Sequence, residues 1–198
     1  MKRLAAVLVT AVVTALFFSS PAFSRMPTYS KLCEILKENL SSYKMQKCTG
    51  ANMTYGSYQT TMANTIVKIN GGKITLTVAS GNMLGSWSPM FTKNFSMETE
   101  SAKVESKKID GFNGGIMINK KEKNSGAVFV CLKPYRNVCV AAVLAEFSGV
   151  PVKTALSTVK RLDLERLAEL FKDVKPPSQP MQPVPGMPPM APPVGGYN

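Results

Sequence analysis

Apolar and polar residues alternate along the middle of the chain, a pattern typical of β-strands that bury one face. The alternation is weak in the first of these stretches and clear in the others. They cover residues 43–54, 65–69, 74–78, 103–109, 116–118, 128–132 and 138–142. Turns that contain asparagine or glycine separate several of them, so the pattern predicts an antiparallel sheet of about six to seven strands.

The clearest hairpin surrounds the segment Asn70-Gly71-Gly72. A turn at Gly71-Gly72 would pair Ile69 with Ile74, and the apolar residues of both strands would then share one face. This register predicts a half-buried antiparallel hairpin.

Helical spacing of apolar residues replaces the alternation at both ends of this region. A first helix is expected after Pro27, with an apolar stripe from Leu32 to Leu40. A second helix is expected over Val152–Lys160, and a third follows Asp163, whose carboxylate can cap it. An N-terminal helix, an antiparallel sheet and C-terminal helices packed on one face together predict an α+β fold.

The N-terminus has the three-part pattern of a secretory signal peptide. Lys2 and Arg3 precede an apolar run over residues 4–18, and Ala22-Phe23-Ser24 places small residues at the cleavage positions. The run is shorter than the roughly 20 residues that span a bilayer, which favours a cleaved signal, residues 1–24, over an anchor. The chain is therefore expected to be exported, to the periplasm or the cell exterior.

The remaining chain divides into two parts by composition. Residues 25–174 are long enough to build a single α+β domain with its own core. Residues 175–198 are rich in proline, methionine and glycine, a composition that cannot form a core. This segment is predicted to be a disordered tail, either a docking segment for a protein partner or a passive spacer.

Four cysteines are present, and an even number in an exported chain predicts disulfide bonds. Cys33 and Cys48 flank the end of the first helix, whereas Cys131 and Cys139 lie on the two arms of an expected hairpin. The spacing favours the pairs Cys33–Cys48 and Cys131–Cys139 among the three possible connectivities.

The second hairpin is expected to turn near Tyr135. If Cys131 faces Cys139, Val130 lies opposite Val140, so one register satisfies both the disulfide and the core.

The chain is basic, with a net charge of +12 that falls to +10 when Lys2 and Arg3 leave with the signal. A basic surface favours anionic partners, so an anionic polymer, a lipid surface or an envelope protein is expected to bind. The alternative is a solvated lysine face that protects the edges of the sheet. The densest lysines form the candidate binding set, which is Lys103, Lys107, Lys108, Lys120, Lys121 and Lys123.

No histidine is present. This absence excludes Ser-His-Asp and Cys-His catalysis and removes the commonest general base near neutral pH. Carboxylates are sparse, and Glu98 and Glu100 form the nearest pair outside the helices. The sequence therefore predicts a non-catalytic binding or structural protein without a cofactor, with an envelope enzyme as an alternative.

A second alternative is the binding of a soft metal ion. Thioether sulfur selects Cu(I), and an indole ring can lie over a bound cation. Met83, Trp87 and Met90 lie close together in the sequence and are the candidate ligands. Methionine also fills apolar cores, so packing is the competing explanation.

The order of the expected elements resembles that of a group of small, exported bacterial proteins of uncharacterised function. The resemblance covers residues 30–173 and rests on Ile109-Asp110-Gly111, on the strand Gly126–Leu132 and on Asp163-Leu164-Glu165-Arg166-Leu167. The architecture is similar to α+β domains of the Mog1/PsbP kind. This resemblance implies a fold, and it supplies no catalytic or ligand-binding residues.

Overall fold

A computed structural model describes residues 26–55, 58–81, 94–136 and 138–174. These residues form nine strands and three short helices. The strands are β1 (Lys44–Met45), β2 (Thr49–Tyr55), β3 (Tyr58–Ile69), β4 (Gly72–Ser80), β5 (Ser96–Glu98), β6 (Ala102–Ile109), β7 (Phe112–Asn119), β8 (Gly126–Tyr135) and β9 (Val138–Ser148). The helices are α2 (Tyr29–Asn39), α4 (Val152–Val159) and α5 (Leu164–Leu170).

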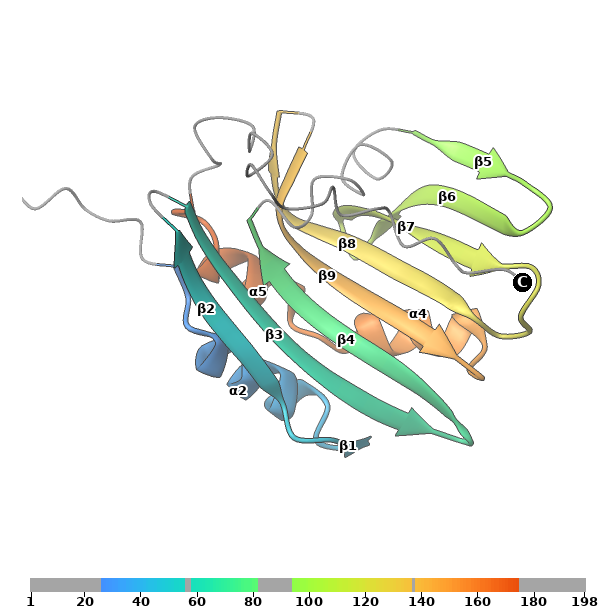
Figure 1. Ribbon diagram of the computed structural model, residues 1–198, viewed down its shortest axis with the longest axis horizontal. Coiled ribbons are helices and arrows are strands. Elements are labelled where there is room, and N and C mark those ends of the chain that lie inside the picture. The colour runs from blue at the N-terminus through green and yellow to red at the C-terminus, as the bar shows by residue number, and fades with distance from the viewer. Residues whose placement is uncertain (1–25, 56–57, 82–93, 137, 175–198) are drawn as a thin grey trace, which may run out of the picture.

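All nine strands belong to one sheet in which every pairing is antiparallel. The strand order is β1-β3-β4-β9-β8-β7-β6-β5, and β2 pairs with β3 on the same side as β1. Figure 1 shows the twisted sheet in front of the three helices, which cover one face of it.

The predicted α+β class with six to seven strands is wrong, because the described residues are mainly antiparallel β-sheet with nine strands. The expected first strand, residues 43–54, is two strands, since the chain changes its register on β3 between Met45 and Thr49. β3 begins at Tyr58 because its polar first residues pair with β2, although its pairing with β4 begins only at Met62. β5 is three residues long, which is too short for alternation to reveal it.

The main core lies between the helices and the side of the sheet that faces them, which we call the helix face. Ala63, Val67, Ile74 and Val143 contribute to it from the sheet. Leu32 and Leu36 of α2, Leu167 of α5 and Phe171 directly after α5 complete it, and all four are fully buried. A smaller cluster lies on the opposite side, the second face, where Ala79, Val104, Phe129 and Ala142 are buried. Residues of a strand alternate between these faces, so each strand segment contributes to both.

Buried polar groups tie the start of α2 to the sheet. The Thr61 hydroxyl donates to the Pro27 carbonyl at 2.8 Å and accepts from Asn52 Nδ2 at 2.7 Å. The same amide donates to the Pro27 carbonyl at 3.1 Å, and Asn52 Oδ1 accepts from the Tyr29 amide at 2.9 Å. Thr61 can therefore be fully buried without an unsatisfied group.

The β3–β4 hairpin turns one residue earlier than the sequence suggested. Its turn is Asn70-Gly71, and both residues have positive φ, 43° and 84°. Asn-Gly favours this conformation in two-residue hairpins because it matches the twist of the strands. Val67 consequently pairs with Ile74, whereas the predicted partner of Ile74 was Ile69. The shift moves the pairing by two residues, so the same apolar residues still face the core.

The predicted register of the β8–β9 hairpin is also wrong. Val130 pairs with Val143 rather than with Val140, and Pro134 pairs with Cys139. The register is interrupted between Cys131 and Pro134, where β8 carries an irregularity. Periodicity alone cannot locate such an insertion, because the residues on either side keep their alternation.

Both disulfides have the pairing expected from the sequence. Cys33 and Cys48 join α2 to the start of β2, with their Cα atoms 5.6 Å apart. Cys131 and Cys139 join β8 to β9, with their Cα atoms 5.7 Å apart. Two disulfides fit an oxidising compartment. Among the described residues, no helix is both long enough and apolar enough to cross a membrane.

The three helices lie where helical spacing placed them. α5 begins after Asp163, whose carboxylate accepts from the Arg166 amide at 2.9 Å. The predicted signal peptide, residues 1–24, and the predicted tail, residues 175–198, lie outside the described residues.

Candidate anion-binding face

Three lysines form a straight row across the second face of the sheet. Lys44 of β1 pairs with Lys68 of β3, and Lys68 pairs with Lys73 of β4. Neighbouring strands are about 4.8 Å apart, so the three side chains leave the sheet at that spacing, perpendicular to the strands. All three are exposed. We call Lys44, Lys68 and Lys73 the lysine row.

The short strand β1 is held in place from three directions. The Gln46 amide donates to the Ile66 carbonyl at 2.8 Å, and the Thr65 hydroxyl donates to the Gln46 carbonyl at 2.9 Å. Arg161 lies over the Tyr43 ring, with its guanidinium carbon 5.2 Å from the ring centroid. The Cys33–Cys48 disulfide fixes the chain that follows β1. Lys44 is therefore presented from an anchored backbone.

The lysine row has no carboxylate to neutralise it. No Asp or Glu occurs between Glu38 and Glu98, a stretch that contains β1, β2, β3 and β4. Glu146 of β9 lies on the same face, opposite Thr75. Within the described ranges, no ion pair involves Glu146 or the row; those found join Lys120 to Glu98, Lys160 to Asp110, Arg166 to Glu38 and Lys172 to Glu169.

Like charges directly opposite each other destabilise a sheet, so this arrangement carries a cost in stability. The row concentrates positive potential on one end of the sheet, where an anion could bind.

Uncharged polar groups continue the surface beside the row. Along the same face, Thr75 and Thr77 of β4 follow Lys73, and Asn64 of β3 pairs with Thr77, while Thr75 lies opposite the apolar Ile66. Asn64 Nδ2 donates to the Thr77 hydroxyl at 2.9 Å, a bond that uses neither the Asn64 carbonyl oxygen nor the Thr77 hydroxyl proton. The surface can thus combine charge attraction with hydrogen bonding to a ligand.

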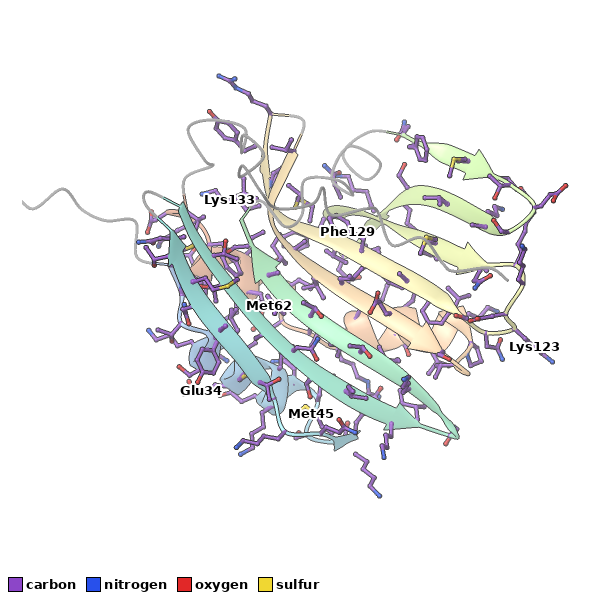
Figure 2. The ribbon with its side chains drawn as sticks, viewed as in Figure 1. Glu34, Met45, Met62, Lys123, Phe129 and Lys133 are labelled. Atoms are coloured by element: carbon purple, nitrogen blue, oxygen red, sulfur yellow. A yellow bond between two sulfur atoms is a disulfide. The ribbon has the colours of Figure 1, made fainter. Side chains whose placement is uncertain are left out.

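The six lysines expected from the sequence do not form one patch. Lys103 and Lys107 lie on the helix face of β6, whereas Lys108 lies on the second face. Lys121 and Lys123 are exposed in the β7–β8 connection, where Figure 2 shows Lys123 at the far end of the sheet from the helix α2. Lys120 is paired with Glu98, its Nζ lying 2.7 Å from the carboxylate.

The Lys120–Glu98 pair is the clearest electrostatic interaction of that region. The hydrogen bond from Lys120, followed by its positive charge, lowers the pKa of Glu98 below its ordinary value. Lys120 also donates to the Thr99 carbonyl at 2.9 Å. Its charge is used within the protein, so Lys120 is a poor candidate for binding an external anion.

The candidate soft-metal ligands Met83, Trp87 and Met90 lie outside the described residues. In the ranges that are described, no group of three or more Cys, Asp or Glu side chains could hold a metal ion. Glu98 and Glu100, the nearest pair of carboxylates outside the helices, are both exposed at the β5–β6 end of the sheet.

A cleft of about 480 Å³ lies beside the N-terminus of α2. Its polar lining consists of Thr28, Lys31, Asn52, Thr54, Gln59 and Thr60. The Asn52 amide is already bonded to Pro27, Tyr29 and Thr61, and the cleft has one charged side chain, Lys31. This set contains no nucleophile paired with a base, so it offers no recognisable catalytic arrangement.

Sequence reasoning missed the lysine row because its members are spread along the chain and meet only through strand pairing. The signal was the distribution of acidic residues, since four lysines and no carboxylate lie between Glu38 and Ser80. Comparison of the chain with protein-family models, curated proteins and solved structures returns no match. The resemblance to domains of the Mog1/PsbP kind therefore stays a prediction.

Proposed function

We propose that this chain is an exported, non-catalytic binding protein that binds an acidic polysaccharide on the lysine row. The lysine row is the observation that carries the proposal, because three lysines occupy directly paired positions on adjacent strands without an intervening carboxylate. The signal pattern of residues 1–24 and the two disulfides support export to an oxidising compartment.

A linear polymer suits this surface better than a membrane does. The charges are arranged in a line across adjacent strands at about 4.8 Å intervals, so a chain of acidic groups can follow them. Membrane-binding surfaces commonly combine positive charge with apolar side chains that enter the lipid. The large hydrophobic residues that are exposed in the described ranges are Tyr29, Met53, Met97, Ile118, Tyr135 and Val138, and none lies on β3 or β4.

The test compares two charge reversals in the mature protein on a heparin resin, with a soluble sulfated polysaccharide as competitor. Lys68→Glu inverts the centre of the row, whereas Lys107→Glu makes the same change in net charge at an exposed site on the opposite face of β6, four strands away from β4. Wild type is expected to elute at a higher salt concentration than Lys68→Glu, because the variant has less positive charge in the row. Salt releases both proteins from the resin because it screens their charges. Lys107→Glu should elute close to wild type.

Equal elution of the two variants would mean that overall charge, not the row, causes retention, and the proposal would fail. Anionic lipid vesicles give the second arm of the experiment. Binding to vesicles that depends on Lys68, without competition from polysaccharide, would assign the row to a lipid surface and overturn the choice of ligand.

A further inference from the structure

The strand β2 presents a long free edge. Within the described ranges it pairs with β3 alone, through seven consecutive residue pairs from Thr49–Asn64 to Tyr55–Tyr58, without a bulge. Its sequence, TGANMTY, contains no charged residue and no proline. Proteins ordinarily protect such edges with lysine, proline, bulges or short strands. The opposite edge of this sheet follows that rule, because β5 has three residues and includes Glu98.

The hydrogen bonds of β3 show which β2 groups face outward. The Ile66 carbonyl accepts from Gln46 on the β1 side, whereas the Thr61 amide donates to Ser80 on the β4 side. The amide and carbonyl of one residue point the same way in a strand, and the direction alternates. The even-numbered residues of β3 therefore bond to β2.

On β2 the partners of those even-numbered residues are Thr49, Ala51 and Met53. The amide and carbonyl groups of Gly50, Asn52 and Thr54 consequently face away from the sheet.

This edge is complementary to itself. In an antiparallel pair centred on Asn52, Gly50 of one copy faces Thr54 of the other, and Asn52 faces its own counterpart. The three outward-facing residues thus form three hydrogen-bonded pairs, each exchanging two N–H···O bonds. On the second face, Met53 would lie opposite Ala51 of the other copy, in the closely spaced type of pair.

We propose that the β2 edge binds the β2 edge of a second copy of this chain, which makes one continuous sheet across the dimer. The proposal is independent of the ligand of the lysine row. The lack of charge on β2 supports a second copy as the partner. The whole chain is basic, yet β2 contains no charged side chain that would repel the β2 strand of the other copy. Packing supports it as well, because Met53 is 49% exposed and gains an apolar neighbour.

The test is sedimentation velocity of the mature protein, with disulfides intact, over a series of concentrations. Wild type is expected to show a monomer–dimer equilibrium. Met53→Lys should raise the dissociation constant by at least about tenfold, since each dimer loses two apolar contacts and places two ammonium groups at the junction. Met97→Lys is the matched control, because Met97 is 40% exposed on β5 at the opposite edge.

Amide hydrogen exchange provides the second readout and needs no variant. Protection of the Gly50, Asn52 and Thr54 amides should increase with protein concentration, while the Ala51 and Met53 amides stay protected throughout by β3. A wild type that remains monomeric, or equal dissociation constants for the two lysine variants, would overturn the proposal. If the Gly50, Asn52 and Thr54 amides are protected to the same extent at every protein concentration, a segment of the same chain covers the edge. That result would also overturn the proposal.

Discussion

Repulsion within the lysine row should lower the free energy of unfolding of the protein. The substitution Lys68→Glu should therefore raise it. Lys68 lies directly opposite Lys44 on one side and Lys73 on the other. Replacing it by glutamate converts two repulsive cross-strand pairs into two attractive ones. Lysine and glutamate have similar, low preferences for strands, so backbone propensity changes little.

The size of the gain follows from the exposure of the three side chains. Two unit charges about 5 Å apart in bulk water interact by roughly 0.8 kcal/mol, and physiological salt reduces this further. Measured cross-strand charge pairs contribute about 0.2–1 kcal/mol, and exposed pairs lie at the low end. Reversing two pairs should therefore raise the free energy of unfolding by about 0.5–1 kcal/mol at low salt. That increase corresponds to roughly 1–4 °C in Tm for a chain of this size.

The assay is urea unfolding of the wild type, Lys68→Gln and Lys68→Glu, with the disulfides intact, at low and at high salt. Lys68→Gln removes both repulsions without adding attractions and should fall midway. The differences should shrink in high salt. Lys123→Glu, which has no lysine opposite it in a strand pair, should change stability less. A glutamate variant that is less stable than wild type, or a gain that salt leaves unchanged, would refute the electrostatic account of the row.

Two further outcomes are expected from other parts of the sheet. Cys33→Ala combined with Cys48→Ala should lower the free energy of unfolding by about 3 kcal/mol, because the disulfide closes a loop with a sequence separation of 15; urea unfolding measures this, and an unchanged midpoint would contradict it. Lys120→Gln should raise the pKa of Glu98 toward its usual range, because the hydrogen bond and charge of Lys120 lower that pKa. Since a lowered pKa stabilises the folded state above the ordinary pKa of the carboxyl group, this pair's contribution should disappear as the pH falls through the pKa of Glu98 in the folded protein. Carboxyl NMR titration checks this, and an unshifted Glu98 curve would count against it.

Local patterns in the sequence were sufficient for the helices and for most strand positions. The apolar stripe from Leu32 to Leu40 lies on the buried side of α2, and Asp163 caps α5 as its position suggested. These features depend on residues within one or two helical turns of each other, and such spacing is visible in a sequence. The pairing of the cysteines was also accessible, because short separations left few geometrically reasonable partners.

The registers were not accessible, because several registers satisfy the same pattern. In the β3–β4 hairpin, turns at Asn70-Gly71 and at Gly71-Gly72 bury the same apolar residues, and the backbone preference of Asn-Gly decides between them. In the β8–β9 hairpin, the irregularity after Cys131 changes which β9 residues face the helices. Buried polar residues posed a third difficulty. Thr61 is buried, and its hydroxyl forms hydrogen bonds with Pro27 and Asn52. A hydrophobicity pattern cannot predict the burial of such a polar residue.

The lysine row depends on those registers, and this dependence explains why the density of lysines along the chain pointed to a different set. Density along the chain favours residues such as Lys120 and Lys123, yet a turn or an ion pair can disperse or neutralise them. Lys44 and Lys68 are separated by two strands' length of chain and become neighbours only through the β1–β3 pairing. An extended stretch without carboxylates is a more useful signal, because every lysine within it stays uncompensated by its sequence neighbours whatever the register. For a sheet built from consecutive hairpins, such a stretch predicts a basic region even when the individual pairings are unknown.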